Sequence, residues 1–140
     1  MIFLPQKFFE EIISHALAEL PIEACGLLGG KVAGDKRFVE KIYCLTNADK
    51  SREHFSMTPA EQFAAVKDMR SHGWKLLGNF HSHPETPARM SDEDKRLALD
   101  KNLSYLILSL AEVEPILKSF RFGAEKTFTE EEISYVGGEL

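Results

Sequence analysis

A chain of 140 residues with 44% hydrophobic and 28% charged side chains has the length and composition of one globular domain, whose core needs neither disulfides nor metal. Its net charge of -5, without a lysine or arginine cluster, argues against a nucleic-acid surface, and no apolar run approaches the roughly 20 residues of a membrane span. The first residues lack the basic and apolar regions of a signal peptide. We therefore expect a single cytoplasmic domain over residues 1–140, with a protein or peptide as partner.

Hydrophobic periodicity and turn residues divide the chain into helices and strands. Spacings of three and four residues indicate amphipathic helices, short apolar runs indicate strands, and glycine and proline mark turns. In chain order the predicted elements are a helix over residues 5–20, a hairpin of strands over 25–28 and 38–45, an irregular connection over 47–56, a helix from Thr58 to about Ser71, a strand over 74–80, a short helix over 95–100, a central strand over 103–110, and edge strands or a last short helix within 116–122 and 128–136. The fold class is therefore α+β, close to α/β, with a mixed sheet packed between helices.

The two cysteines, Cys25 and Cys44, are too few for a disulfide framework and form no C-x-x-C pair. We expect both to be reduced and buried. Cys25 lies two residues after Glu23, so a thiol near a functional site is one option, but the role of a small buried hydrophobic residue is favoured. Among the isolated histidines, His15 is expected at the surface or boundary of its helix, and His54 on a loop surface rather than as an extra metal ligand.

One stretch in the middle of the chain holds the only closely grouped set of metal-ligand residue types. A predicted strand ends at Pro84, since proline has no N–H for a sheet ladder. Side chains alternate along a strand, so His81 and His83 point to the same side. Asp94 follows at the start of a helix that Ser91 caps. Two histidines and a carboxylate are a typical protein ligand set of catalytic zinc, and we predict a zinc site here.

Each part of this pattern also has a purely structural interpretation. A serine followed three residues later by an acid is a capping-box pattern, which fits Ser91 and Asp94. A lone His-x-His pair is usually an ordinary strand end. Either part alone would favour the structural interpretation, whereas the two together favour the metal site.

The segment His81-Ser82-His83-Pro84, followed after six residues by Ser91 and then by Asp94, resembles the signature of the JAMM or MPN+ zinc metallopeptidases. The similarity extends upstream, because family members carry a glutamate just before a strand of the C-G-L-L type. Here Glu23 precedes Cys25-Gly26-Leu27-Leu28. The fixed offsets among these residues, together with Glu23 at the expected distance upstream, make this a highly specific resemblance.

The resemblance covers roughly Leu4 to Phe122 and implies one MPN-type domain with a catalytic Zn²⁺. It also implies that Glu23 is the general base rather than a ligand, and that Ser91 donates a hydrogen bond to the oxyanion of the tetrahedral intermediate. The chemistry agrees, because zinc lowers the pKa of its bound water toward about 7 and a nearby carboxylate can accept the proton.

The implied reaction is hydrolysis of the peptide or isopeptide bond that follows the C-terminal Gly-Gly of ubiquitin or a ubiquitin-like protein. A glycine tail suits such a site, because it enters a narrow groove and adds to an exposed strand without side-chain clashes. The connections over residues 47–56 and 85–90 are short and leave little room for the insertions of ubiquitin-chain-specific relatives. The compact chain looks more like prokaryotic relatives that act on ubiquitin-like sulfur-carrier proteins.

Two other function classes stay open. The first is a non-catalytic MPN-type scaffold that binds partners and retains zinc. The second is a zinc deaminase, whose H-x-E and P-C-x-x-C elements this sequence lacks. The last residues, Val136-Gly137-Gly138-Glu139-Leu140, contain a glycine pair like that of the implied substrate, so recognition or trimming of a neighbouring molecule's tail is a hypothesis beside that of an ordinary frayed end. The sequence carries no signal for an oligomeric state.

Overall fold

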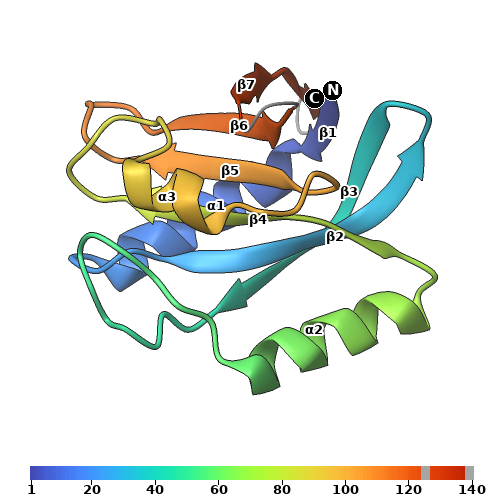
Figure 1. Ribbon diagram of the computed structural model, residues 1–140, viewed down its shortest axis with the longest axis horizontal. Helices are drawn as coiled ribbons and strands as arrows, with labels where there is room; N and C mark the ends of the chain where they lie inside the picture. Colours follow the sequence, from blue (N-terminus) through green and yellow to red (C-terminus); the bar gives the residue numbers. More distant parts are fainter. Residues whose placement is uncertain (124–126, 138–140) are drawn as a thin grey trace.

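The computed structural model describes residues 1–123 and 127–137 (Figure 1). Within these residues, one mixed sheet contains the strands in the order β7-β6-β5-β4-β2-β3-β1-β8. In chain order the elements are β1 (Ile2–Pro5), α1 (Gln6–Glu19), β2 (Cys25–Ala33), β3 (Lys36–Leu45), α2 (Pro59–Ser71), β4 (Lys75–His83), α3 (Asp92–Leu97), β5 (Ser104–Ser109), β6 (Ile116–Phe122), β7 (Phe128–Glu131) and β8 (Ile133–Val136).

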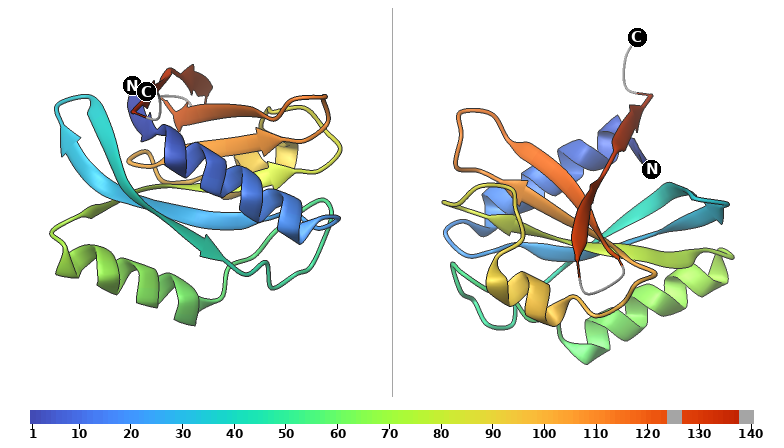
Figure 2. Two further views of the ribbon diagram at one scale, coloured as in Figure 1. Left: turned by 180° about the vertical axis from the view of Figure 1, so that it is seen from behind. Right: turned by 45° about the horizontal axis from the view of Figure 1, so that its top comes forward.

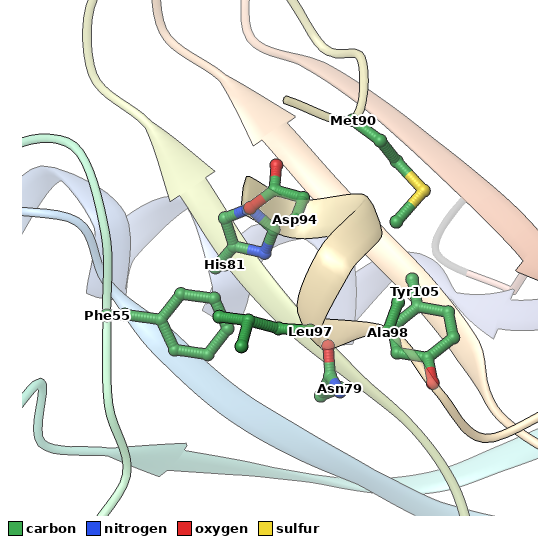
Figure 3. A pocket seen from close by; sticks show the side chains of 8 residues that line it. All are labelled: Phe55, Asn79, His81, Met90, Asp94, Leu97, Ala98 and Tyr105. Carbon is green, nitrogen blue, oxygen red and sulfur yellow. The ribbon is translucent and has the colours of Figure 1, made fainter. Parts of the chain in front are cut away.

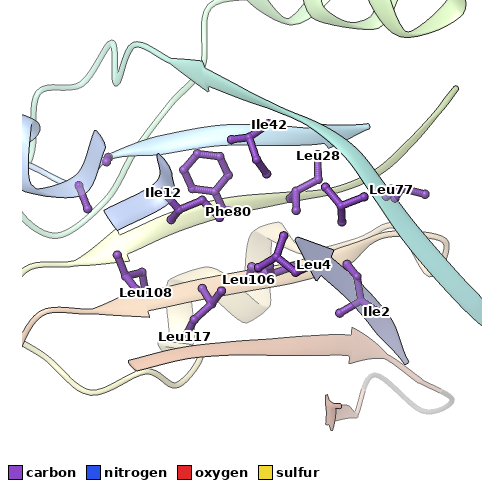
Figure 4. Packing of buried hydrophobic residues seen from close by; sticks show 13 residues of the cluster. Ile2, Leu4, Ile12, Leu28, Ile42, Leu77, Phe80, Leu106, Leu108 and Leu117 are labelled. Carbon is purple, nitrogen blue, oxygen red and sulfur yellow. The ribbon is translucent and has the colours of Figure 1, made fainter. Parts of the chain in front are cut away.

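Helices cover both faces of the sheet, and of the helices in the described residues only α1 lies on one of them. Figure 1 shows α3 in front of β4 and β5. The left view of Figure 2, which shows the molecule from behind, has α1 lying across the opposite face of the sheet. On β2, Leu28 packs in the α1 cluster (Figure 4), whereas its neighbour Leu27 packs with α2. On β5, Leu106 belongs to the α1 cluster and Ile107 to a cluster beside α3. The sequence of a strand that is buried on both faces is a continuous run of apolar residues, and β5 contains such a run.

The expected α+β fold, with a mixed sheet between helices, is confirmed. Thr58 caps α2 as predicted, and its side chain accepts a hydrogen bond from the backbone N–H of Glu61. The short third helix starts at Asp92, directly after its predicted cap Ser91, and it ends at Leu97, before the predicted end at residue 100. Among the helices of the described residues, none has the length and apolar character that a membrane span requires.

The edges of the sheet differ most from expectation. The sequence pattern misses β1, which has four residues and is held by parallel pairing with β3 and β8. Residues 128–136 form two strands on opposite edges, β7 beside β6 and β8 beside β1, rather than one element. In the described part of 116–136 there is no helix. Pairing partners far along the chain decide these edges, and local propensity does not encode them.

Both cysteines are free, and Cys25 is buried as expected. The prediction that Cys44 is buried is wrong. It lies next to the end of β3, where it faces the exposed rim of α1 and its thiol approaches the carboxylate of Glu11 at 3.9 Å. A strand end beside a helix rim is covered by fewer side chains than a strand centre.

The pairing of β4 places the functional site. This strand runs antiparallel to β2 and parallel to β5, with His81 opposite Cys25 on one side and Ile107 on the other. The residues that precede β2, including Glu23, therefore lie beside the end of β4 that carries the histidines.

Candidate active site

Two histidines from β4 and one aspartate from α3 converge on one point. The two Nε2 atoms of His81 and His83 are 3.2 Å apart. Asp94 Oδ1 lies 3.2 Å from His81 Nε2, and Asp94 Oδ2 lies 3.1 Å from His83 Nε2. His81 and Asp94 face one another in the close view of Figure 3. The alternation expected along the strand thus brings both rings to the aspartate, and these three residues could together hold a metal ion.

The surroundings of His83 orient it as a ligand. Its Nδ1–H donates to the backbone oxygen of Pro87 at 2.9 Å, which leaves Nε2 facing His81 and Asp94. A second hydrogen bond of this kind is the usual support of a metal-binding histidine. Two ring nitrogens and two carboxylate oxygens therefore lie close together. A cation placed among these electron-rich atoms would stabilise them electrostatically. The donor set therefore fits a metal ion.

Titration behaviour within the cluster follows from burial and mutual contact. Burial lowers the pKa of His81. Burial also acts to lower the pKa of His83, but its hydrogen bonds with Asp94 and Pro87 raise it overall. For Asp94, burial acts to raise the pKa, yet the hydrogen bonds with both histidines hold it well below its usual range. The aspartate is therefore ionised, as a metal ligand must be.

Ser91 and Asp94 form the predicted capping box. The Asp94 N–H donates to Ser91 Oγ, and the Ser91 N–H donates to Asp94 Oδ2, each at 3.0 Å. The carboxylate that completes the cap is the same one that faces the histidines, so capping does not prevent Asp94 from facing a metal ion. Ser91 is exposed and lines a cavity that His83 also lines.

Glu23 supplies a buried carboxyl group beside this cluster. It is 3% exposed, and within the described residues its Oε1 has no hydrogen-bond partner. Burial is the main cause that raises its pKa to about 8; His83 lowers the pKa, and Asp94, Glu93 and Glu53 raise it further. Glu23, His83 and Ser91 line one cavity of about 560 Å³. A buried, unpaired carboxyl group with a pKa near neutrality is suited to proton transfer.

Two residues that sequence reasoning did not single out complete the site. Ser82 lies between the histidines and points the other way, where its Oγ accepts the N–H of Ala24 at 2.8 Å and its own N–H donates to Ala24 O at 3.0 Å. Alternation predicts that direction but not the partner. Phe55 stacks on the ring of His81 with centroids 4.7 Å apart, and nothing in the local sequence signals this contact.

A smaller cavity of about 50 Å³ adjoins His81 and Asp94 (Figure 3). Its other walls are mainly apolar. They are formed by Phe55, Asn79, Met90, Leu97, Ala98 and Tyr105. His81, His83 and Asp94 therefore lie between a large polar cavity and a small apolar one.

The remaining sequence candidates lie outside the metal cluster. His54 is exposed on its loop, as expected, and its ring lies 3.2 Å from the Asp49 carboxylate. His15 is half-buried, at the boundary as expected, and its Nε2 lies 3.2 Å from the backbone oxygens of Cys25 and Leu45. Gly138 to Leu140, on which the tail hypothesis depends, lie outside the described residues.

Comparison with known proteins gives a consistent family assignment. A family model described as prokaryotic homologs of the JAB domain matches residues 5–123. The CysO-cysteine peptidase of Mycobacterium tuberculosis is 29% identical over 126 residues, which cover 89% of this chain and 84% of that protein. The desampylase of Haloferax volcanii is 31% identical over 105 residues, covering 71% and 74%. A Desulfitobacterium hafniense protein of known solution structure is 59% identical, with a TM-score of 0.89 over 97% of this chain and 93% of that one.

Proposed function

Because this chain belongs to the family of prokaryotic JAB-domain proteins, we propose that it is a zinc metallopeptidase that hydrolyses the bond after the C-terminal Gly-Gly of a ubiquitin-like protein. Relatives carry the names CysO-cysteine peptidase, TtuB-protein conjugate cleaving protease and desampylase. These names support a hydrolase of ubiquitin-like conjugates. Zinc as the metal and Gly-Gly as the recognised tail are the finer parts of the proposal.

The observation that carries the proposal is the meeting of a metal-ligand set and an unpaired carboxyl group in one cleft. His83 faces the other two ligands and also lines the large cavity with Glu23. A scaffold without catalysis has no use for a buried carboxyl group beside the metal, because burying it without a partner costs stability. Hydrolysis gives this arrangement a function.

Each residue has a separate role in the proposed reaction. His81, His83 and Asp94 hold the zinc ion, which when bound supplies Lewis-acid activation of a water molecule and of the scissile carbonyl. Glu23 accepts a proton from the attacking water and passes it to the leaving amine. The Ser91 hydroxyl donates to the oxygen of the scissile carbonyl as negative charge develops there.

The proposed substrate is a ubiquitin-like protein of the sulfur-carrier type, joined through its Gly-Gly tail to a second group. The decisive experiment incubates the zinc-loaded chain with candidate fusions of such proteins and follows their intact mass. We expect release of a fragment that ends in Gly-Gly. Metal-stripped chain and the Glu23→Gln variant serve as inactive controls. Stoichiometric zinc with every fusion intact would favour the non-catalytic scaffold.

A further inference from the structure

Asn47 lies at the centre of a hydrogen-bond network next to the proposed base. Its side chain is fully buried, at 0% exposure. Nδ2 donates to the backbone oxygens of Glu23 at 3.0 Å and His54 at 3.1 Å, while Oδ1 accepts from the N–H groups of Asp49 at 3.0 Å and Ser56 at 3.2 Å. An amide offers two donor hydrogens and two acceptor lone pairs, so all four are used.

The loop organised by Asn47 forms a wall of both cavities. It connects β3 to α2, and in Figure 1 it rises beside the start of β2. Arg52, Glu53 and His54 line the large cavity. The next residue, Phe55, lines the small cavity and stacks on His81 (Figure 3). The loop therefore borders both cavities that adjoin His81, His83 and Asp94.

The same loop holds the backbone of Glu23 from both sides. The Glu23 N–H donates to Ser51 O at 2.8 Å, and its carbonyl oxygen accepts the Asn47 amide. A further bond from Ala48 N–H to Ser56 O, at 2.8 Å, closes the base of the loop. Because Glu23 Oε1 has no partner among the described residues, the position of the carboxyl group depends largely on how its backbone is held.

We propose that Asn47 is a positioning residue that holds the base Glu23 and the wall formed by residues 52–55 in register with each other. The proposal rests on the function proposed above and adds a residue that does not touch substrate. Positioning matters for the rate, because displacing a catalytic group by about 1 Å can cost on the order of a hundredfold in turnover. The four bonds of Asn47 oppose such a displacement.

Two substitutions test the hydrogen bonds of the Asn47 side-chain amide. Asn47→Asp keeps the two acceptor positions and removes both donors, whereas Asn47→Ala removes all four bonds. Asn102→Asp is the matched control, since it makes the same chemical change at an exposed side chain in the turn before β5. Activity is expressed as kcat per mole of bound zinc, so that loss of folded protein does not count as loss of turnover.

We expect both Asn47 variants to retain zinc and to lose about tenfold or more in kcat, with the Asn102 control at the wild-type value. Amide hydrogen exchange gives a second readout that needs no substrate. Exchange at Glu23 should rise about tenfold or more in the Asn47 variants, while exchange at Ile107 in the central strand stays unchanged. Unchanged Glu23 exchange would overturn the proposal, and so would unchanged kcat per bound zinc. A wild-type chain that binds zinc but cleaves no fusion would instead refute the proposed function, and exchange would still decide whether Asn47 holds Glu23.

Discussion

Oδ2 of Asp94 accepts the backbone N–H of Ser91 at 3.0 Å and lies 3.1 Å from Nε2 of His83. One oxygen atom therefore belongs both to the helix cap and to the candidate metal cluster. The cap bond orients the carboxylate before any metal binds, in the way that outer hydrogen bonds orient metal ligands elsewhere. Because its donor is a backbone N–H, no substitution at position 91 other than proline directly removes it.

Ser91→Ala should therefore keep the metal and lose other properties. The substitution removes the cap bond from the Asp94 N–H, which should cost about 1 kcal/mol of stability. It also removes the proposed oxyanion donor, and we expect kcat to fall about tenfold or more. Zinc analysis, urea unfolding and turnover of a Gly-Gly fusion check these effects. Ser71→Ala, on an exposed helix end, is the control, and a Ser91→Ala variant with full kcat would limit Ser91 to capping.

Replacing both ligand histidines should abolish metal binding without unfolding the chain. His81→Ala combined with His83→Ala leaves only Asp94 of the ligand set, and one carboxylate does not hold zinc at stoichiometric level. The hydrophobic clusters do not depend on metal, so the circular dichroism spectrum should stay native. His54→Ala is the matched control, since His54 lines the large cavity together with His83. Retention of one zinc per chain by the double variant would refute the ligand assignment.

Glu23→Gln tests the base separately from the metal. Glutamine has nearly the same shape but its side chain does not accept a proton, so zinc and fold should persist while the rate falls by about 10² to 10⁴. Glu85→Gln, which makes the same change at another residue of the large cavity, should keep most of the activity. Turnover per bound zinc is the measurement. Near wild-type turnover by Glu23→Gln would exclude Glu23 from proton transfer.

The pKa of Glu23 also predicts how the stability of metal-stripped protein depends on pH. Burial raises this pKa from 4.5 to about 8, so between these values the folded chain retains a proton that the unfolded chain has lost. The free energy of unfolding therefore decreases as pH rises, by up to on the order of 4 kcal/mol from this group. Urea unfolding of metal-stripped wild type and Glu23→Gln between pH 5 and 8 checks it. As pH rises, the free energy of unfolding of wild type should fall relative to that of Glu23→Gln. If the two free energies depended on pH in the same way, the raised pKa would be contradicted.

The convergence of His81, His83 and Asp94 could be predicted from the sequence because the information for it is local. Alternation along one strand orients His81 and His83, and a capping motif a few residues later places Asp94. The contacts that could not be predicted from the sequence depend on partners elsewhere in the chain. Phe55 reaches His81 through the path of a loop, and β1 becomes a strand because β3 and β8 pair with it.

For Glu23, local sequence is not enough to predict a functional role. A glutamate after a helix-ending proline has no local feature that sets it apart, and only the motif resemblance singled it out. Its burial and its place in the large cavity follow from the pairing of β2 with β4 and from the network around Asn47. The raised pKa follows from that environment and cannot be read from neighbours in the sequence.

The pairing of β2 with β4 also affects the order in which the site is acquired during folding. His81 and Asp94 are separated only by one short loop, so bringing them together costs less entropy than adding Glu23, which joins them only when two distant segments pair. Non-local pairings of this kind form late and slowly. Bringing the candidate metal ligands together thus requires a much shorter loop closure than bringing the proposed base to them.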